Sequence, residues 1–530
     1  MASAILMFLA GSAEATTFCV PGFFAACPNN GTNVANLNLE NAASSFGTDG
    51  VADTIYVDAS TYTDPATFEP VGTDALNIIG SGVDKTVITS SASGNIFVAN
   101  LNSSSRQVDM SDLTIEIPAS FPDVGGNGSA LQAKNGTFDH VDIRSLNNRS
   151  DGADSLIGTT VWKHSHVYGA AGGTIGDGFV PNSSGPPGSL LISDTTIDDA
   201  SWGVVAYYKT EPVTLRNSRI NPAQAYNVRV SDGGQFTMEN SVIVTGGSEA
   251  VSVASTGAPA DLANVSATIR NSTIIQGPNA DATDRGVKVE VTNSFDASAT
   301  VTDSIIRGFK NTWETVAPFG PGLGHVSLSF KYSNFDPVGL PEDSPAVDLT
   351  GPGNINQDPM FAGANDFRLM SGSPSIDTGD PAPGGILDDY DGAVRPQDGN
   401  GDGSAIRDQG AYEAPIVPTC LNTASLCPPP IDTTKPVVSK VKFKAPQKKA
   451  GSLMFRLSEA ATVKVTFKPV PAKKKPMRKT VKLSKKAKAG ANTLKLKKGK
   501  LKSGKYRLTI VAVDVAGNES KPIVKKVRAH

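Results

Sequence analysis

The amino-acid sequence predicts an all-β protein: a right-handed parallel β-helix (a solenoid) followed by a small β-sandwich. Three observations lead to this fold class. A short pattern returns nine times between Met110 and Phe335, and repetition at such intervals indicates a solenoid or an array. The segments around each copy are short, β-branched and alternating, which is typical of strands. With 52 Gly and 35 Pro among 530 residues, the chain is also rich in turns.

Each copy of the pattern has a leading residue with one apolar residue two positions before it and another three positions after it. For Asn217 these are Leu215 and Ile220. Asn and Asp predominate at the leading position, and they tolerate the left-handed conformation of a tight bend better than other non-glycine residues. The nine leading residues are Asp112, His140, His164, Asp194, Asn217, Asn240, Asn271, Asp303 and Tyr332. Strand, bend, strand and a variable loop therefore form one coil, and like residues of successive coils stack about 4.8 Å apart.

The N-terminal region carries signs of export. Residues 1–15 have a short apolar core followed by Ala13-Glu-Ala15, a small-x-small cleavage pattern, and are predicted to be a signal peptide. Residues 16–50 are predicted to form an N-terminal cap, with a short amphipathic helix between Val34 and Phe46 that would cover the open sheet edge. No other apolar run is long enough for a membrane span. We therefore expect an extracellular or cell-surface protein.

The four cysteines fall into two local pairs, Cys19 with Cys27 and Cys420 with Cys427. An even number, close spacing and an export signal favour two disulfides, although four cysteines allow three connectivities. Neither pair has a nearby histidine, so a metal site is the weaker alternative.

Two parts of the chain resemble segments of bacterial β-helix proteins. Asp53-Thr-Ile-Tyr-Val57, Leu76-Asn-Ile-Ile-Gly80 and Thr86-Val-Ile88 resemble the first coils of the pectate-lyase-like superfamily, and the β-helix is expected over residues 51–355. Residues 356–415, from Gln357-Asp-Pro-Met-Phe361 to Asp408-Gln-Gly-Ala-Tyr-Glu413, resemble the choice-of-anchor Q segment. That resemblance implies a C-terminal cap without chemistry of its own.

The C-terminal part differs in charge. Residues 416–431 form a Pro-rich linker, and residues 432–530 resemble a bacterial immunoglobulin-like domain in their opening Asp432-Thr-Thr-Lys-Pro-Val437 and their ending at Asn518. From residue 432 onward there are 29 Lys and Arg against 4 Asp and Glu, a net charge of +25. Because the whole chain carries −3, residues 1–431 carry −28. The Lys-rich domain either docks on anionic wall polymers through a salt-sensitive contact or is a solubilising spacer.

Candidate catalytic residues are few. Asp198 and Asp199 form an adjacent carboxylate pair, and Lys209 and Arg219 are basic residues that could abstract a proton. Polygalacturonases also have an Asp–Asp pair, but the other motifs of that family appear here only in altered order and spacing. Glycoside hydrolysis needs two carboxylates on opposite sides of the bond, and adjacency in sequence does not provide that.

Other candidates are binding residues. Trp202, Tyr207 and Tyr208 could form a glycan-contact patch, since aromatic faces suit sugars; core packing is the alternative. His140 and His164 occupy the bend position, so we expect them to be structural, and His166 is expected to face outward above Asp142.

One segment resembles half of a calcium loop. Asp398, Asn400 and Asp402 offer oxygen ligands on alternate positions before Gly403, and Asp408 could complete the set. A structural Ca²⁺ is thus predicted, with a plain Asp/Gly turn as the alternative.

The functional prediction is a secreted or cell-surface rod that binds glycans or has a structural role, without catalysis. The alternative is a polysaccharide lyase or glycoside hydrolase acting in a groove on the β-helix. The expected partner is a polysaccharide or cell-wall polymer. Nucleic acid is not expected, because the lysines lack interleaved aromatic residues. The sequence makes no prediction of the oligomeric state.

Overall fold

The fold was taken from a computed structural model. It describes residues 15–36, 38–39, 42, 50–64, 74–91, 96–99, 107–120, 129–147, 151–170, 174–181, 188–207, 212–221, 225–246, 249–256, 263–278, 283–317, 322–341, 347–382, 384–416, 435–445, 450–471, 478–514 and 518–530. The chain divides into two compact units, residues 1–419 and residues 420–530. Among the described residues, no helix has both the length and the apolar character that a membrane crossing requires.

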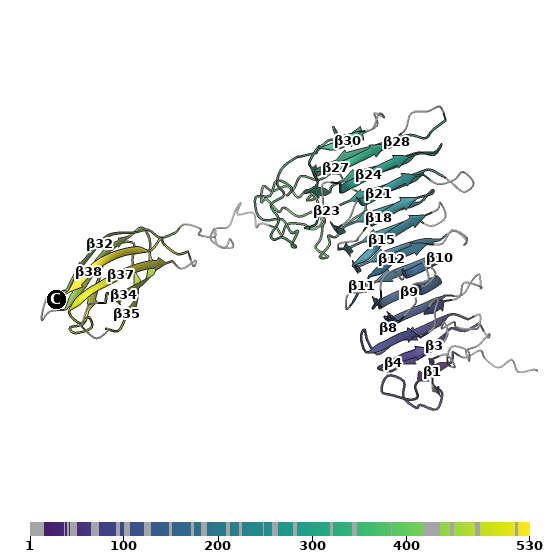
Figure 1. The fold of residues 1–530 in the computed structure, drawn as a ribbon, viewed down its shortest axis with the longest axis horizontal. Coiled ribbons are helices and arrows are strands. Elements are labelled where there is room, and N and C mark those ends of the chain that lie inside the picture. Colours follow the sequence, from purple (N-terminus) through teal and green to yellow (C-terminus); the bar gives the residue numbers. More distant parts are fainter. Residues whose placement is uncertain are drawn as a thin grey trace, which may run out of the picture. The chain divides into compact units, whose positions relative to one another are not determined.

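The first unit is a parallel β-solenoid whose strand pairings form three stacks, and Figure 1 shows successive strands stacked along the solenoid. We call the stacks the first, second and third sheets. The first sheet contains β1 (Thr17–Val20), β3 (Asp53–Val57), β5 (Leu76–Ile79), β8 (Val108–Ile117), β9 (Ser129–Ser145), β10 (Asp151–Lys163), β13 (Ser189–Ser193), β16 (Val213–Arg216), β19 (Gln235–Glu239), β22 (Val265–Arg270), β25 (Ala297–Thr302), β28 (Val326–Lys331) and β31 (Val347–Asp348). The second contains β4 (Ser60–Asp64), β6 (Thr86–Ser90), the ends of β8 and β9, β11 (His166–Gly169), β14 (Thr196–Asp198), β17 (Arg219–Ile220), β20 (Val242–Thr245), β23 (Thr273–Gln276), β26 (Ile305–Arg307) and β29 (Asn334–Phe335). The third contains β7 (Phe97–Ala99), the beginnings of β9 and β10, β12 (Ile175–Pro181), β15 (Ala200–Tyr207), β18 (Tyr226–Ser231), β21 (Glu249–Ser255), β24 (Arg285–Val291), β27 (Asn311–Val316) and β30 (Gly339–Pro341).

The bend between the first and second sheets confirms the sequence prediction. All nine leading residues have a positive φ, from 45° at Asn240 to 58° at Asp112. This is the left-handed region that Asn and Asp enter at the lowest cost. The two apolar positions of each copy face inward: Leu215 and Ile220, for example, are fully buried in the main core. The β-helix fold class is therefore confirmed.

A serine ladder lies immediately behind the bends. Ser218, Ser241, Ser272, Ser304 and Ser333 each follow a bend residue and are fully buried. Each hydroxyl donates to a carbonyl two residues earlier, as Ser241 Oγ does to Glu239 O at 2.7 Å. Each also accepts from the backbone N–H of the corresponding residue in the preceding coil, as Ser272 Oγ does from Ser241 N at 3.2 Å. The ladder thus supplies hydrogen bonds to buried N–H groups at the corner.

The N-terminal cap is partly described. Cys19 and Cys27 form a disulfide, which confirms that pair, whereas Cys420 and Cys427 lie outside the described residues. Val34 and Ala35 form the short strand β2 (Val34–Ala35), paired in parallel with β1, and not the start of the expected helix. Residues 1–14, most of the proposed signal peptide, lie outside the described range, as does most of the expected helix.

The segment from residue 356 to 416 packs along the side of the solenoid. Val242 and Val244 of β20 contact Phe367, Ala411 and Tyr412, and Ile305 of β26 contacts Leu369, Ile376 and Ala414. These are outer residues of the second sheet, which are apolar in these coils. We expected a cap here, and the contacts described are lateral, over several coils.

The bend residues also anchor this segment. Asn240 Nδ2 donates to Asp388 O at 2.7 Å, and Asp380 N donates to Asp303 Oδ1 at 2.6 Å. The bend residues therefore stabilise the coils and also bind the C-terminal segment, residues 356–416, which we call the C-terminal cover.

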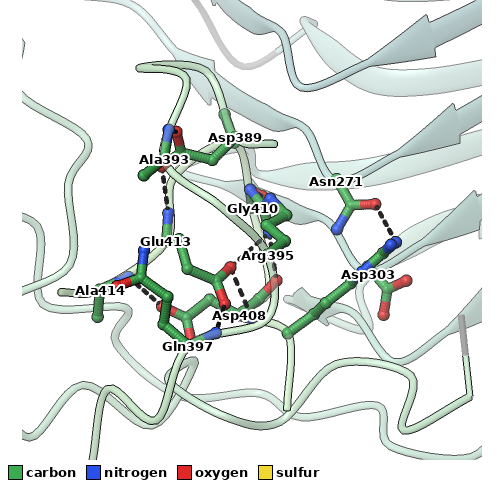
Figure 2. Close-up of polar contacts among 12 residues, drawn as sticks. Asn271, Asp303, Asp389, Ala393, Arg395, Gln397, Asp408, Gly410, Glu413 and Ala414 are labelled. Carbon is green, nitrogen blue, oxygen red and sulfur yellow. Dashed lines mark hydrogen bonds and ion pairs between the residues drawn. The ribbon is translucent and has the colours of Figure 1, made fainter. Parts of the chain in front are cut away.

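A buried ionic network stabilises the segment itself (Figure 2). Arg395 Nη1 lies 3.0 Å from Glu413 Oε2, and both side chains are completely buried. Arg395 also donates to the carbonyl oxygens of Asp408 and Gly410. Burial and the neighbouring Glu413 charge raise the pKa of the Asp408 carboxyl. Hydrogen bonds and ion pairs within the segment thus stabilise it in place of a large apolar core.

The second unit has two antiparallel sheets. One contains β32 (Val438–Lys444), β33 (Gly451–Leu457) and β36 (Gly490–Leu496), and the other contains β35 (Val481–Ala487), β34 (Ala461–Pro469), β37 (Gly504–Val513) and β38 (Ile523–Ala529). Leu453, Val463, Phe467 and Leu508 are fully buried between them. The Tyr506 hydroxyl donates to Lys502 O at 2.8 Å, a contact that also occurs in immunoglobulin-like sandwiches. The immunoglobulin-like assignment stays a resemblance.

Replacing Asn217 tests the bend. Its φ of 47° costs a residue with a Cβ atom about 1–2 kcal/mol but costs glycine little. We expect Asn217→Ala to lower the free energy of unfolding of the solenoid by about 1 kcal/mol relative to Asn217→Gly, measured by chemical denaturation. Both variants lose the same side-chain contacts, so equal stabilities would contradict a conformational role for this position.

Candidate functional site

The outer face of the second sheet is strongly polar in the coils before the C-terminal cover. Arg144 donates to Glu116 Oε2 from Nη2 at 2.6 Å and to Asp84 Oδ1 from Nη1 at 2.6 Å. His166 Nε2 lies 2.6 Å from Asp198 Oδ2, and its ring stacks on Tyr168 with centroids 4.1 Å apart. His166 faces outward above Asp142, as expected, since its backbone N–H donates to Asp142 Oδ1.

Two of the candidate catalytic residues, Asp198 and Arg219, lie on this face, and a third, Asp199, lies at the bend that follows β14. Burial raises the pKa of Asp198, but hydrogen bonds from His166 and Asn221 outweigh it and bring the pKa below its usual value. Asp199 is at a bend with φ of 54°, and burial together with the Asp198 charge raises its pKa. Arg219 Nε donates to Asn221 Oδ1 at 2.6 Å. Asp198 and Arg219 are thus joined through Asn221, whereas Lys209 lies outside the described residues.

The outer face of the third sheet brings aromatic residues together. Trp202 of β15 pairs with Tyr226 of β18 in the parallel register, and their rings meet edge to face with centroids 5.5 Å apart. The Arg229 guanidinium lies 5.0 Å from the centre of the Tyr226 ring. Both aromatic rings are partly exposed. Tyr207 lies at the end of β15, and Tyr208 lies outside the described residues.

Two carboxyls lie beside these rings. Asp177 of β12 pairs with Trp202, and its backbone N–H donates to Asp151 Oδ1 at 3.0 Å. Burial, then the charges of Asp151 and Asp154, raises the pKa of Asp177 to about 7. Burial and Asp154 likewise raise the pKa of Asp151 to about 6. Carboxyls in this range can donate as well as accept hydrogen bonds near neutral pH.

Farther along the same face, the charges pair with one another. Glu249 follows Tyr226 in the register, and Arg285 follows Glu249. Arg285 Nε lies 3.0 Å from Glu314 Oε2, and Lys288 Nζ lies 3.2 Å from Glu290 Oε2. We call the surface formed by Asp151, Asp177, Trp202, Tyr226 and Arg229 the aromatic–carboxyl face.

Tyr226, Asp151 and Asp177 were not singled out from the sequence. Their neighbours come from coils of different length, so their alignment follows from the register and not from a motif. The sequence also did not show that a bend at Asp199 places Asp198 and Trp202 on different sheets.

The proposed calcium ligands have other partners in this structure. Asp398 Oδ1 and Oδ2 accept from the backbone N–H groups of Gly401 and Gly403. Asp402 Oδ1 accepts from Ser404 N, as Asn400 Oδ1 does from Asp402 N. Asp408 is fully buried and accepts from Asp377 N and Ala414 N. The first three residues thus build turns while Asp408 faces the buried network, and calcium binding stays a prediction.

Comparisons with known proteins yield fold-level likenesses. No protein-family model matches the chain, and no curated protein does. Among solved structures, a pectate lyase matches with 12% identity and a TM-score of 0.35, covering 76% of this chain and 97% of its own. A GH87 α-1,3-glucanase catalytic unit from Streptomyces thermodiastaticus matches with 15% identity and a TM-score of 0.33, over 60% of this chain and 67% of its own. The A-module of a mannuronan C-5 epimerase from Azotobacter vinelandii matches with 14% identity and a TM-score of 0.28, over 57% and 91%.

The raised carboxyl pKa values predict a pH dependence of stability. Asp151, Asp177 and Asp303 have folded-state pKa values of about 6, 7 and 6, against about 3.9 when unfolded. At pH values between the unfolded and the folded pKa, the folded state binds more protons than the unfolded state. The free energy of unfolding therefore falls as pH rises through this range. We expect the melting temperature of the solenoid to fall from pH 5 to pH 8. The decrease should be smaller in Asp177→Asn, and an unchanged or steeper decrease in that variant would contradict the assignment to Asp177.

Proposed function

We propose that the protein binds a neutral polysaccharide along the aromatic–carboxyl face of the solenoid. The observation that carries this proposal is the Trp202–Tyr226 pair, aligned across adjacent coils and flanked by carboxyls on one side and Arg229 on the other. Aromatic rings offer the apolar faces of sugars a flat contact surface, while the polar groups beside them provide hydrogen bonds to hydroxyls.

The charges favour a neutral glycan over an acidic one. Asp151, Asp154 and Asp177 lie at one end of the face, where their ionised forms would repel a uronic acid chain. Arg285 and Lys288 at the other end are each paired with a glutamate. A neutral chain meets no such repulsion. An extracellular or cell-surface location is part of the proposal, and the Cys19–Cys27 disulfide supports it.

The binding prediction concerns Trp202. Removing the indole deletes the largest apolar contact on the face, so we expect Trp202→Ala to weaken binding to a neutral polysaccharide about tenfold, equivalent to about 1.4 kcal/mol. The measurement is affinity electrophoresis or calorimetry with neutral and acidic polysaccharides, each at low and high salt. Tyr168→Ala, which removes a partly exposed tyrosine from the second sheet, is the matched control.

The salt dependence separates this face from the Lys-rich unit. Binding through Trp202 should persist at high salt, whereas binding of acidic polymers through the lysines should fall. Equal affinities of Trp202→Ala, Tyr168→Ala and the unmodified protein for every neutral polysaccharide would contradict the proposal.

A second candidate function is glycoside hydrolysis on the same face. The specific observation is that the pKa of Asp177 is raised to about 7 beside a second carboxyl, Asp151. An acid that is still protonated near neutral pH can protonate a leaving-group oxygen, while an ionised partner acts as base or nucleophile. The geometry of a bound glycan would decide between these roles.

For this candidate, we expect the appearance of reducing ends from a neutral polysaccharide, with activity that falls above pH 7 as Asp177 ionises. Asp177→Asn should reduce the rate at least about a hundredfold, because an amide is no general acid. Intact chains across the polysaccharide panel would contradict hydrolysis and leave the binding proposal in place.

A further inference from the structure

Two histidines and one aspartate converge at the corner between the first and second sheets. Asp139 Oδ1 lies 2.9 Å from His140 Nδ1 and 2.8 Å from His164 Nδ1. The three ligand atoms all lie within 4.8 Å of one another. Among the described residues, this is the one group of three or more His, Cys, Asp or Glu side chains with that property.

The solenoid holds these groups in place. His140 and His164 are bend residues of successive coils, with φ of 55° and 53°, so their backbones are stacked by the parallel pairing of the strands beside them. Their rings lie face to face with centroids 4.9 Å apart and an interplanar angle of 25°. Asp139 is the neighbour of His140 in β9 and pairs with Lys163 of β10. The backbone positions of the three ligands are thus set by the fold before any ion arrives.

The ligand set matches a particular class of metal ion. Two imidazole nitrogens and one carboxylate oxygen suit Zn²⁺ and its neighbours in the first transition series, whereas Ca²⁺ and Mg²⁺ prefer oxygen ligands alone. Metal–ligand bonds of about 2.0–2.2 Å in a tetrahedron place ligand atoms about 3.3–3.5 Å apart. The two contacts of Asp139 therefore need to lengthen by about half an ångström. Because an imidazole lone pair lies in the plane of its ring, the two stacked rings must also rotate so that both Nδ1 atoms point at the ion, and their exposed positions leave room for this rotation.

We propose that Asp139, His140 and His164 form a binding site for a divalent transition-metal ion, with Zn²⁺ as the ion of choice. The imidazoles present their Nδ1 lone pairs and Asp139 presents Oδ1, and the proton of each neutral imidazole moves to Nε2. The side chains of His140 and His164 are 54% and 46% exposed, so the fourth position faces solvent and takes water. This site is separate from the aromatic–carboxyl face and does not depend on the function proposed for it.

Lys163 orients the carboxylate and sets a limit on affinity. Its ammonium lies 2.9 Å from Asp139 Oδ2, on the oxygen that the histidines do not contact. This contact holds Asp139 with Oδ1 toward the histidines, as a partner behind a ligand does in other metal sites. The same positive charge weakens attraction for a cation. The ion links residues 24 positions apart in adjacent coils, as His140 and His164 show, so binding should stabilise the folded solenoid.

The experiment is a titration of the full chain with Zn²⁺ at pH 7.5, followed by calorimetry and by thermal unfolding. We expect one saturable site and a higher melting temperature at saturation. His140→Asn and His164→Asn should each weaken binding at least about tenfold and abolish the thermal shift. Asparagine occupies this bend in neighbouring coils, at Asn217 and Asn240, so these variants keep the backbone conformation, which circular dichroism checks.

His325→Asn is the matched control, because His325 is an exposed histidine 3.2 Å from Asp296 without a second histidine. It should leave Zn²⁺ affinity unchanged. Co²⁺ in place of Zn²⁺ gives a second readout, since its visible absorption reports a tetrahedral site and should disappear in His164→Asn. Absence of saturable Zn²⁺ binding would overturn the proposal, and so would equal affinities of the His164→Asn and His325→Asn variants.

Discussion

The left-handed bend between the first and second sheets is the constraint on which the rest of the molecule depends. Nine residues adopt it, and each turns the chain between two strands that would otherwise run past the core. The serine ladder behind the bends satisfies the backbone N–H groups that such a corner buries. The bends also carry the C-terminal segment, through Asn240 and Asp303. One local conformation thus underlies the coil, the corner hydrogen bonds and the cover.

The outer faces are free to diversify because the core and the bends carry the stability. On the second sheet, the same outward columns hold Asp142, His166 and Arg219 in early coils but Val242 and Ile305 in later ones. The C-terminal segment packs on these apolar residues, and it also contacts the charged outer residues Arg219 and Arg307. On the third sheet, carboxyls, aromatic rings and paired charges follow one another along a single column. A stacked fold therefore presents several chemically distinct surfaces on one scaffold.

Some functional features could be foreseen and others could not. The bend residues and the inward apolar residues repeat at fixed positions, so their roles were predictable from a local pattern. The outward position of His166 above Asp142 followed from the same pattern. Its partner Asp198 was not foreseen, because Thr196 is the residue directly opposite and Asp198 reaches His166 from two residues farther along. The apolar outer positions Val242 and Val244 were a readable sign that another segment packs on this face.

The architecture of the coils could be derived from the chain alone, because strands, bends and core follow from residue types at fixed spacing. The contacts between outward side chains could not be derived in this way, because they form between different coils. Trp202 with Tyr226 and His166 with Asp198 lie in coils that are joined by loops of unequal length, so their contacts depend on strand register and on packing across coils. Proximity of that kind arises from hydrogen bonding between coils, and no local pattern encodes it.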